Sequence, residues 1–284
     1  MEVSPASYHV IADLLAERTG QNLTESRRWR IGTSLAGVFR ERGITNVDQL
    51  ACLLATERES QLADDVVEAL LNNETYFFRD KPTFDQLPSY VFPTLAERRK
   101  HQRRLQIWCA GCSTGQEVLS LAIQFAEAGG FWHDWSIDIL GTDVSQKVIS
   151  AARSGQYSQF EVQRGLSVAQ MLDHFDETNS GWQIRSGTRK SVRFERHNLL
   201  EGSPARYRFD LVLCRNVLLY FDAATREKAF ECLHGAVAAD GFIMLGAGET
   251  VVGQTQLFTP AEGRASLYEP VPVATPELRR FARG

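Results

Sequence analysis

The spacing of hydrophobic residues changes near residue 100 and divides the chain into two kinds of structure. Before that point apolar residues recur every three or four positions, as at Ile11 and Leu15, which is the spacing of one helix face. Ser4 followed by Pro5 is typical of a helix start, and a longer second helix is expected over Ser26–Arg42. The N-terminal region is therefore predicted to be all helical.

After residue 104, short apolar runs alternate with helical segments. The runs expected to form strands are Leu105–Cys109, Trp135–Gly141, Val192–Arg196, Phe209–Cys214 and Gly241–Leu245. Strands that alternate with helices are typical of βαβ units, so a mainly parallel sheet is predicted. The pattern is less regular over about 156–190, where Trp182–Ile184 and Ser191–Phe194 are candidates for a small antiparallel ribbon.

These patterns predict an α/β protein with a small all-helical N-terminal domain and a doubly wound, mainly parallel, Rossmann-like sheet that carries a small antiparallel β insertion. Along the chain we expect a helical domain over 1–72 and a linker that leads to the ligand site over 73–104. The sheet domain is expected over 105–272, with its insertion at about 156–190, and a loosely held tail over 273–284.

Composition and charge argue against several classes of protein. The chain is 43% hydrophobic with a formal net charge of −4, and no apolar run approaches the roughly 20 residues of a membrane span. The balanced charge argues against a general nucleic-acid binder, and the N-terminus lacks a secretory signal pattern. The five cysteines have no framework spacing, which indicates reduced thiols in a cytoplasmic protein.

Two local features have ordinary explanations. Cys109 and Cys112 have CxxC spacing, but without a second pair or a His at ligand spacing no metal site is predicted. The basic cluster of Arg27, Arg28 and Arg30 is more typical of a solvated helix face than of a binding patch, although its charge would suit an acidic partner.

Polar residues follow four of the predicted strands. They are the turn from Cys109 to Glu117 with Gly111, then Asp143, then Asn198, and finally Arg215 with Asn216. Ligands of open α/β sheets bind at the carboxyl ends of strands, and an unpartnered buried polar group costs about 1–3 kcal/mol. One adenosine-like ligand along this edge would partner all of them. For Asp143 two roles stay open, which are to bind ribose hydroxyls or to cap the following helix.

Together these motifs resemble those of the chemotaxis receptor methyltransferases, the CheR-type family. The matching segments are Asn73–Arg79, Cys112–Glu117, Gly141–Asp143 with Ala152–Tyr157, and Cys214–Asp222. The resemblance runs from about Leu62 to Phe258, and the helical N-terminal region fits the family's small leading domain. One departure is Gln116, which replaces the first of the family's paired Glu residues, and another is Val118-Leu119 in place of the common Pro-Tyr.

The resemblance implies an enzyme that uses S-adenosylmethionine and releases S-adenosylhomocysteine, with Arg79 and Tyr220 nearest the transferred methyl group. The residues that it implies for cofactor binding are Asn73, Thr75, Arg79, Gly111, Glu117, Asp143, Asn198, Leu199, Arg215 and Asn216. In this family the acceptor is a glutamate side chain on the cytoplasmic helical bundle of a chemoreceptor. Arg27, Arg28 and Arg30 are the expected contacts with that bundle.

Three functions stay open at this point. The first is a protein-glutamate O-methyltransferase that acts on chemoreceptors in chemotaxis, in the cytoplasm and without membrane insertion. The second is the same chemistry on another protein or a small acid, and the third is a cofactor-binding sensor without turnover. A nucleic-acid methyltransferase is not expected, because Cys214-Arg215-Asn216-Val217 stands where such enzymes typically have Asn/Asp-Pro-Pro-aromatic.

Overall fold

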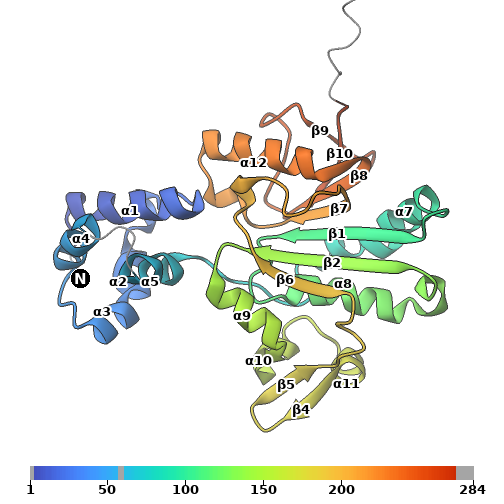
Figure 1. Cartoon of the computed structure of the whole chain (residues 1–284), viewed down its shortest axis with the longest axis horizontal. Helices are drawn as coiled ribbons and strands as arrows, with labels where there is room; N and C mark the ends of the chain where they lie inside the picture. Colours follow the sequence, from blue (N-terminus) through green and yellow to red (C-terminus); the bar gives the residue numbers. More distant parts are fainter. Residues whose placement is uncertain (1–2, 57–60, 273–284) are drawn as a thin grey trace, which may run out of the picture.

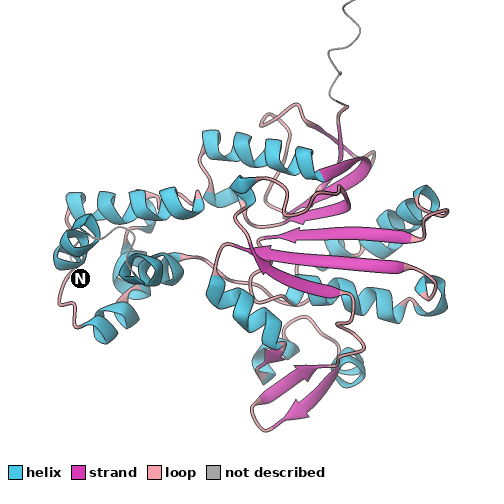
Figure 2. Ribbon diagram, in the orientation of Figure 1, coloured by secondary structure: helices cyan, strands magenta, loops and turns pink. Residues whose placement is uncertain are grey.

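The computed structural model describes residues 3–56 and 61–272. A central sheet forms the middle of the structure (Figure 1). The N-terminal helices lie to one side of this sheet, and a smaller second sheet projects below its edge in Figure 1. Figure 2 shows helices packed on both faces of the central sheet. Within the described residues no helix is long and apolar enough to cross a membrane. The predicted tail, 273–284, lies outside the described residues.

The N-terminal region is helical, as predicted. Its elements are α1 (Pro5–Thr19), η1 (Glu25–Arg27), α2 (Trp29–Ser34), α3 (Ala36–Arg42), α4 (Val47–Thr56) and α5 (Gln61–Leu70). The Ser4 side chain caps α1 by accepting a hydrogen bond from Ser7 N, and Gly20 ends the helix with φ 75°. The single helix expected over Ser26–Arg42 is wrong. The chain turns at Leu35, whose fully buried side chain joins α2 and α3 to one core.

The central sheet has seven strands in the order β6-β2-β1-β7-β8-β10-β9. They are β1 (Arg104–Ala110), β2 (Ser136–Asp143), β6 (Val192–Arg196), β7 (Phe209–Cys214), β8 (Val237–Leu245), β9 (Phe258–Pro260) and β10 (Leu267–Pro270). The first five in this order are parallel neighbours, whereas β10 is antiparallel to both β8 and β9. The strand order reverses between β1 and β7, which is where doubly wound folds bind ligands.

Side chains along the central strands alternate between two hydrophobic layers. In β1, Ile107 joins one core cluster and Trp108 the other, and in β7 Leu211 and Val212 divide in the same way. Because successive strand residues point to opposite faces, both faces require helices. These helices are α7 (Phe92–Arg98), α8 (Gln116–Glu127) and α9 (Gln146–Ser154) on the first face and α12 (Ala223–Ala236) on the second.

The insertion is a separate antiparallel sheet in the order β3-β5-β4. Its elements are β3 (Gln156–Tyr157), α10 (Gln159–Gln163), α11 (Val168–His174), β4 (Phe175–Thr178) and β5 (Gly181–Ile184). The ribbon expected between Trp182–Ile184 and Ser191–Phe194 is wrong. Ile184 pairs with Phe175, and the second segment enters the central sheet as β6, because Phe194 is buried in the main core.

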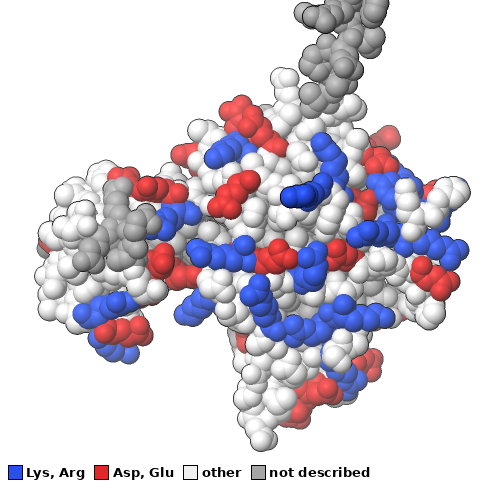
Figure 3. All heavy atoms as spheres, in the orientation of Figure 1, with Lys and Arg blue, Asp and Glu red and all other residues white. Residues whose placement is uncertain are grey.

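Strand β6 forms one edge of the central sheet, and paired charges cover it. Arg193 forms ion pairs with Asp138 at 3.1 Å and with Glu195 at 2.8 Å. Figure 3 shows Lys and Arg interleaved with Asp and Glu along the band that crosses this face. Charged side chains on an edge strand oppose pairing with another chain, so this edge is protected.

The N-terminal helices contact the sheet region directly. Glu68 of α5 accepts a hydrogen bond from Gln146 N at 2.8 Å, at the start of α9, where the helix dipole favours a carboxylate. Gly20 lies so close to Leu200 that a Cβ at this position would overlap its Cδ1. The end of α1 therefore lies beside the segment that follows β6.

The short elements that complete the described chain are α6 (Lys81–Phe84), η2 (Leu87–Val91), η3 (Gly129–Trp132), η4 (Leu199–Glu201) and η5 (Leu218–Tyr220).

Candidate functional site

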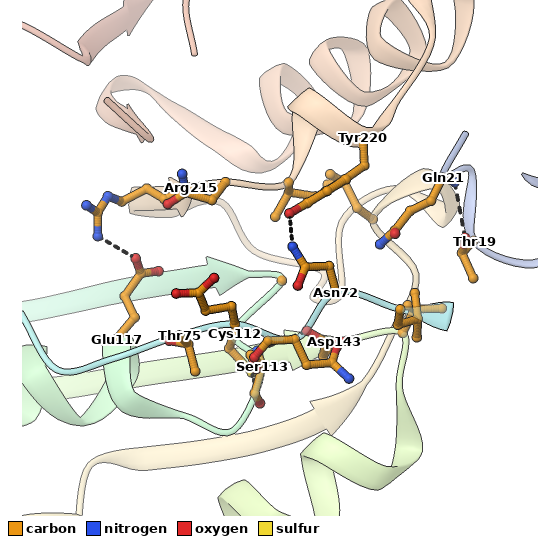
Figure 4. Close-up of a pocket in the computed structure, with 18 of the residues that line it drawn as sticks. Thr19, Gln21, Asn72, Thr75, Cys112, Ser113, Glu117, Asp143, Arg215 and Tyr220 are labelled. Atoms are coloured by element: carbon orange, nitrogen blue, oxygen red, sulfur yellow. Dashed lines mark hydrogen bonds and ion pairs between the residues drawn. The ribbon is translucent and has the colours of Figure 1, made fainter. Parts of the chain in front are cut away.

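A solvent-open cavity lies at the carboxyl ends of β1, β2, β6 and β7, next to the end of α1 (Figure 4). The fold brings to it every residue that the sequence predicted for cofactor binding or catalysis. These residues are Asn73, Thr75, Arg79, Gly111, Glu117, Asp143, Asn198, Leu199, Arg215, Asn216 and Tyr220. The linker, the strand ends and the N-terminal helices thus meet at one site.

The turn after β1 forms one wall of the cavity. Gly111, Ser113 and Gly115 have positive φ angles of 75°, 51° and 93°, so the chain reverses tightly before α8 begins. A Cβ on Gly111 would overlap Cγ2 of Val217, so this close approach requires glycine. The turn places the N-terminus of α8 beside the cavity, where its backbone amides favour polar ligand groups.

The carboxylate of Asp143 is buried at the end of β2. Its Oδ2 accepts a hydrogen bond from Ser113 N at 2.9 Å, and its Oδ1 accepts one from Ser145 N at 3.0 Å. Burial raises the pKa of the Asp143 carboxyl, and these two amides oppose that rise. Helix α9 is capped by Ser145, whose side chain accepts from Val148 N. Asp143 therefore keeps unused lone pairs beside the cavity.

Glu117 and Arg215 share a buried ion pair at one end of the cavity. The Arg215 guanidinium, with a side chain 1% exposed, donates to Glu117 Oε2 at 2.9 Å, to Asp80 Oδ2 at 3.2 Å and to the carbonyl of Arg79 at 2.7 Å. Burial raises the pKa of the Glu117 carboxyl, and Arg215 opposes that rise. Figure 4 shows this pair at the end of the cavity remote from Tyr220. Arg215 thus orients Glu117 and ties α8 to the linker.

Tyr220 stands at the opposite end, where the N-terminal region holds it. Asn72 donates a hydrogen bond to the Tyr220 hydroxyl, and Asn22 N donates to the Tyr220 carbonyl at 2.7 Å. The Arg27 guanidinium lies over the tyrosine ring, 5.3 Å from its centroid. Sequence reasoning found Tyr220 but not Asn22 or Asn72 as its partners, because these contacts join segments far apart in the chain.

Arg79 lies where the linker meets the insertion. Its guanidinium donates to the carbonyl of Glu74 at 2.9 Å and lies 5.5 Å from the centroid of the Tyr76 ring. Arg164 of the insertion lies 4.3 Å from the same centroid and pairs with the Glu74 carboxylate at 2.7 Å. These contacts connect the linker to the insertion, and no sequence motif predicted the role of Arg164.

Asn198 uses both ends of its amide within the protein. Its Oδ1 accepts from Leu200 N at 3.0 Å, which caps η4, and its Nδ2 donates to the carbonyl of Arg18 at 3.3 Å. His197 and the end of α1 also line the cavity, and neither was predicted. No local pattern could reveal them, because only the tertiary fold places α1 beside β6.

Two buried polar atoms beside this cavity, Arg215 Nε and Asn216 Oδ1, lack a hydrogen-bond partner among the described residues. An unpartnered buried polar group costs about 1–3 kcal/mol, so the covered oxygen of Asn216 is an acceptor that the described residues leave unpaired. Asn216 also has φ 60°, a left-handed conformation that Asn tolerates. Together with Asp143 and Glu117, it forms an acceptor-rich site that suits a ligand with ammonium and hydroxyl groups.

The basic cluster of Arg27, Arg28 and Arg30, which runs from η1 into α2, is partly engaged within the protein. Arg28 and Arg30 each donate to a backbone carbonyl of the N-terminal region. Within the described part of the chain, the Arg27 guanidinium forms no hydrogen bond or ion pair and only stacks on Tyr220. Trp29 is 67% exposed. The cluster therefore presents one free cation and one exposed indole near the tyrosine.

Comparison with known proteins identifies relatives along most of the chain. Chemotaxis protein methyltransferase 1 of Pseudomonas aeruginosa is 31% identical over 255 residues, which cover 88% of this chain and 92% of the relative. Chemotaxis protein methyltransferase Cher2 of Pseudomonas putida is 30% identical over 243 residues, which cover 84% and 88%. A solved TehB-like SAM-dependent methyltransferase from Corynebacterium glutamicum aligns at 16% identity with a TM-score of 0.35, over 67% of this chain and 96% of that chain.

A family model matches the part of the chain that provides most of the cavity lining. Residues 73–267, more than half of the chain, match the model described as "CheR methyltransferase, SAM binding domain". The matched range includes every cavity-lining residue that the sequence predicted. The chain therefore belongs to the CheR family of S-adenosylmethionine-dependent methyltransferases.

Proposed function

We propose that the protein transfers the methyl group of S-adenosylmethionine to glutamate side chains on the cytoplasmic helical domain of chemoreceptors, forming methyl esters during chemotaxis adaptation. The observation that carries this proposal is the family match over 73–267, which includes Glu117, Asp143 and Asn216 of the acceptor-rich cavity. Relatives named chemotaxis protein methyltransferases support it along most of their length. The proposed place of action is the cytoplasm, where that receptor domain lies.

In this proposal each part of the cofactor has a counterpart in the cavity. Glu117 would accept hydrogen bonds from the cofactor's ammonium group. Asp143, whose oxygens keep lone pairs beyond their two amide bonds, would accept from the ribose hydroxyls. Asn198 and Leu199 would flank the adenine, and the linker segment 73–79 would close over the methionine end.

The proposed chemistry needs alignment more than proton transfer. S-adenosylmethionine supplies a methyl group on a positively charged sulfur. A glutamate carboxylate has an unperturbed pKa of about 4.3, so it is ionised at neutral pH and needs no general base. Because the attack merges opposite charges, holding the carboxylate in line and removing its water account for most of the catalytic task.

Arg79 and Tyr220 are the proposed source of that alignment. Arg79 donates from one terminal nitrogen to Glu74, which leaves donors of its planar fork for an incoming carboxylate. Tyr220 accepts a hydrogen bond from Asn72, so its own O–H stays available to the acceptor or the cofactor. Arg27, over the tyrosine ring, adds positive charge at the same point.

A protein acceptor needs a docking surface outside the cavity, and α2 is the proposed surface. Trp29 is 67% exposed, and it follows Arg27 and Arg28 and precedes Arg30 in the sequence. Tryptophan and arginine are enriched among residues that dominate binding energy, and positive charge suits an acidic helical bundle. We expect Trp29→Ala to raise the KM for the receptor several-fold and to leave S-adenosylhomocysteine affinity unchanged. An unchanged KM would remove α2 from the docking surface.

Transfer of labelled methyl groups to a receptor fragment tests the proposal. The enzyme is incubated with methyl-labelled S-adenosylmethionine and a chemoreceptor cytoplasmic fragment, and the product is then treated with alkali. We expect alkali-labile label on the fragment and none when its methylation-site glutamates are replaced by alanine. Label on another protein or a small acid would indicate a different acceptor. Tight S-adenosylhomocysteine binding without transfer to any acceptor would indicate a sensor.

A further inference from the structure

The segment that follows β7 builds a wall of the cavity with a backbone that needs support. Asn216 has φ 60°, outside the common regions for residues other than glycine. The next residue, Val217, packs against Gly111 of the opposite turn. Tyr220 follows at the end of η5 and also lines the cavity. Small shifts of this segment would therefore move several cavity-lining groups together.

One buried carboxylate, that of Glu249 in the loop after β8, holds this segment. Its Oε2 accepts hydrogen bonds from Asn216 N at 2.7 Å and Gly246 N at 2.9 Å. Its Oε1 accepts from Val217 N at 3.0 Å and Leu219 N at 3.2 Å. A carboxylate has about four lone-pair sites, so these backbone amides use the acceptor capacity of Glu249 fully.

The position of Glu249 distinguishes it from the carboxylates of the cavity. Three of its four donors belong to the wall segment 216–219, and the fourth belongs to its own loop. Among the described residues the cavity lining includes Asn216 and Tyr220 but not Glu249. Glu249 can therefore act on a bound ligand only through the backbone that it holds.

We propose that Glu249 is a positioning residue, which fixes the wall segment so that Asn216 and Tyr220 meet the cofactor and the acceptor in a productive arrangement. No sequence motif predicted this role, because Glu249 lies far along the chain from the strand end that it supports. The kinetic test of this role rests on the proposed methyl-transfer activity. The binding of S-adenosylhomocysteine tests the same role without any acceptor. Failure of the proposed receptor specificity would thus leave the binding test intact.

Glu249→Gln is the first test, because the amide keeps the size of the side chain but supplies one acceptor oxygen instead of two. Two backbone N–H groups then face an NH2 group. We expect S-adenosylhomocysteine affinity to fall at least about tenfold and kcat to fall more than the KM for the acceptor changes. Glu262→Gln, the same chemical change at an exposed loop position, should match the parent in both.

Gly246→Ala provides a second variant that leaves the charge in place. A Cβ on Gly246 would lie 2.8 Å from Glu249 Oε2 and 2.9 Å from Asn216 N, so a methyl group there displaces the carboxylate. We expect the same loss of affinity and kcat as for Glu249→Gln, and this variant decides the matter if the first does not fold. Parent-like affinity and kcat in either folded variant, with only a lowered melting temperature, would overturn the proposal.

Discussion

The two ends of the parallel sheet both contain buried charged groups, but these groups are partnered in different ways. At the amino ends, Asp210 is 7% exposed and accepts from Arg99 Nε at 2.6 Å and from Gln106 N at 2.8 Å. Arg99 also pairs with Asp240 at 2.6 Å. The charges at this end therefore neutralise one another within the chain.

At the carboxyl ends the pairing is incomplete. Asp143 accepts two backbone amides and keeps further lone pairs, and Asn216 Oδ1 has no partner among the described residues. Arg215 binds Glu117, yet its Nε remains without a partner in the same part of the chain. A buried charge does not by itself mark a ligand site. Unused hydrogen-bonding capacity beside a cavity does.

Arg215→Met should have the largest effect, because it removes the cation that Glu117 and Asp80 share. Losing one partner of a buried ion pair costs about 3–5 kcal/mol, so we expect the free energy of unfolding to fall by about that amount. We also expect S-adenosylhomocysteine affinity to fall by more than about 100-fold, or about 2.7 kcal/mol. Urea unfolding and calorimetry measure the two quantities. Arg215→Lys should recover part of both, and parent-like affinity in a folded Arg215→Met variant would contradict the role of Arg215.

Asp210→Asn tests the other end of the sheet. The amide keeps the size of the side chain but leaves Arg99 with one carboxylate fewer, so the free energy of unfolding should fall by about 2–3 kcal/mol. S-adenosylhomocysteine affinity should stay within about twofold of the parent, because none of the described residues at this end lines the cavity. A clear loss of affinity in this variant would show that the two ends are coupled and that the contrast between them is wrong.

Asp143→Ala separates ligand binding from local structure at the carboxyl ends. If Asp143 holds the ribose, affinity for S-adenosylhomocysteine should fall by about 1–3 kcal/mol, which is roughly tenfold or more. Ser145→Ala is the matched control, because it removes the cap of α9 and should cost about 1 kcal/mol of stability with little change in affinity. If Asp143→Ala binds S-adenosylhomocysteine as tightly as Ser145→Ala and the parent do, Asp143 has a purely structural role.

The pH dependence of binding should show the smallest effect. Burial raises the pKa values of Asp143 and Glu117, so these carboxylates become protonated at a higher pH than exposed ones do. As the pH is lowered, S-adenosylhomocysteine affinity should therefore begin to fall earlier than it would with exposed carboxylates. The free energy of unfolding of the ligand-free protein should instead gain from these carboxyls as the pH falls. A carboxyl with a raised pKa in the folded state adds stability below its unfolded pKa. That contribution is lost as the pH rises through the folded value. Calorimetry across this range in the parent and in Asp143→Ala checks the trend, which should be weaker in the variant.

The fold class and the polar residues at the strand ends were predictable because their signals are local. An apolar run that ends in a polar residue, as at Asp143 and Asn216, identifies both a strand and its carboxyl end. The parallel sheet then forces such ends to one edge. The linker motif from Asn73 to Arg79 was found through its resemblance to a family rather than through its own pattern.

The features that the sequence did not predict depend on tertiary contacts. Asn72 and Arg27 reach Tyr220 only because the N-terminal helices fold back against the sheet. Glu249 serves a strand end that precedes it by a whole helix and strand. Leu35 breaks an otherwise regular helical pattern because its side chain is needed in the core.

A crystal structure of the protein with S-adenosylhomocysteine would show whether this cavity is the cofactor site. We expect electron density in the cavity at the carboxyl ends of β1 and β7, with the ammonium group beside Glu117 and the ribose hydroxyls beside Asp143. The sulfur should face Tyr220 and Arg79. Density at another location, or a ligand in the cavity that contacts neither carboxylate, would contradict the account.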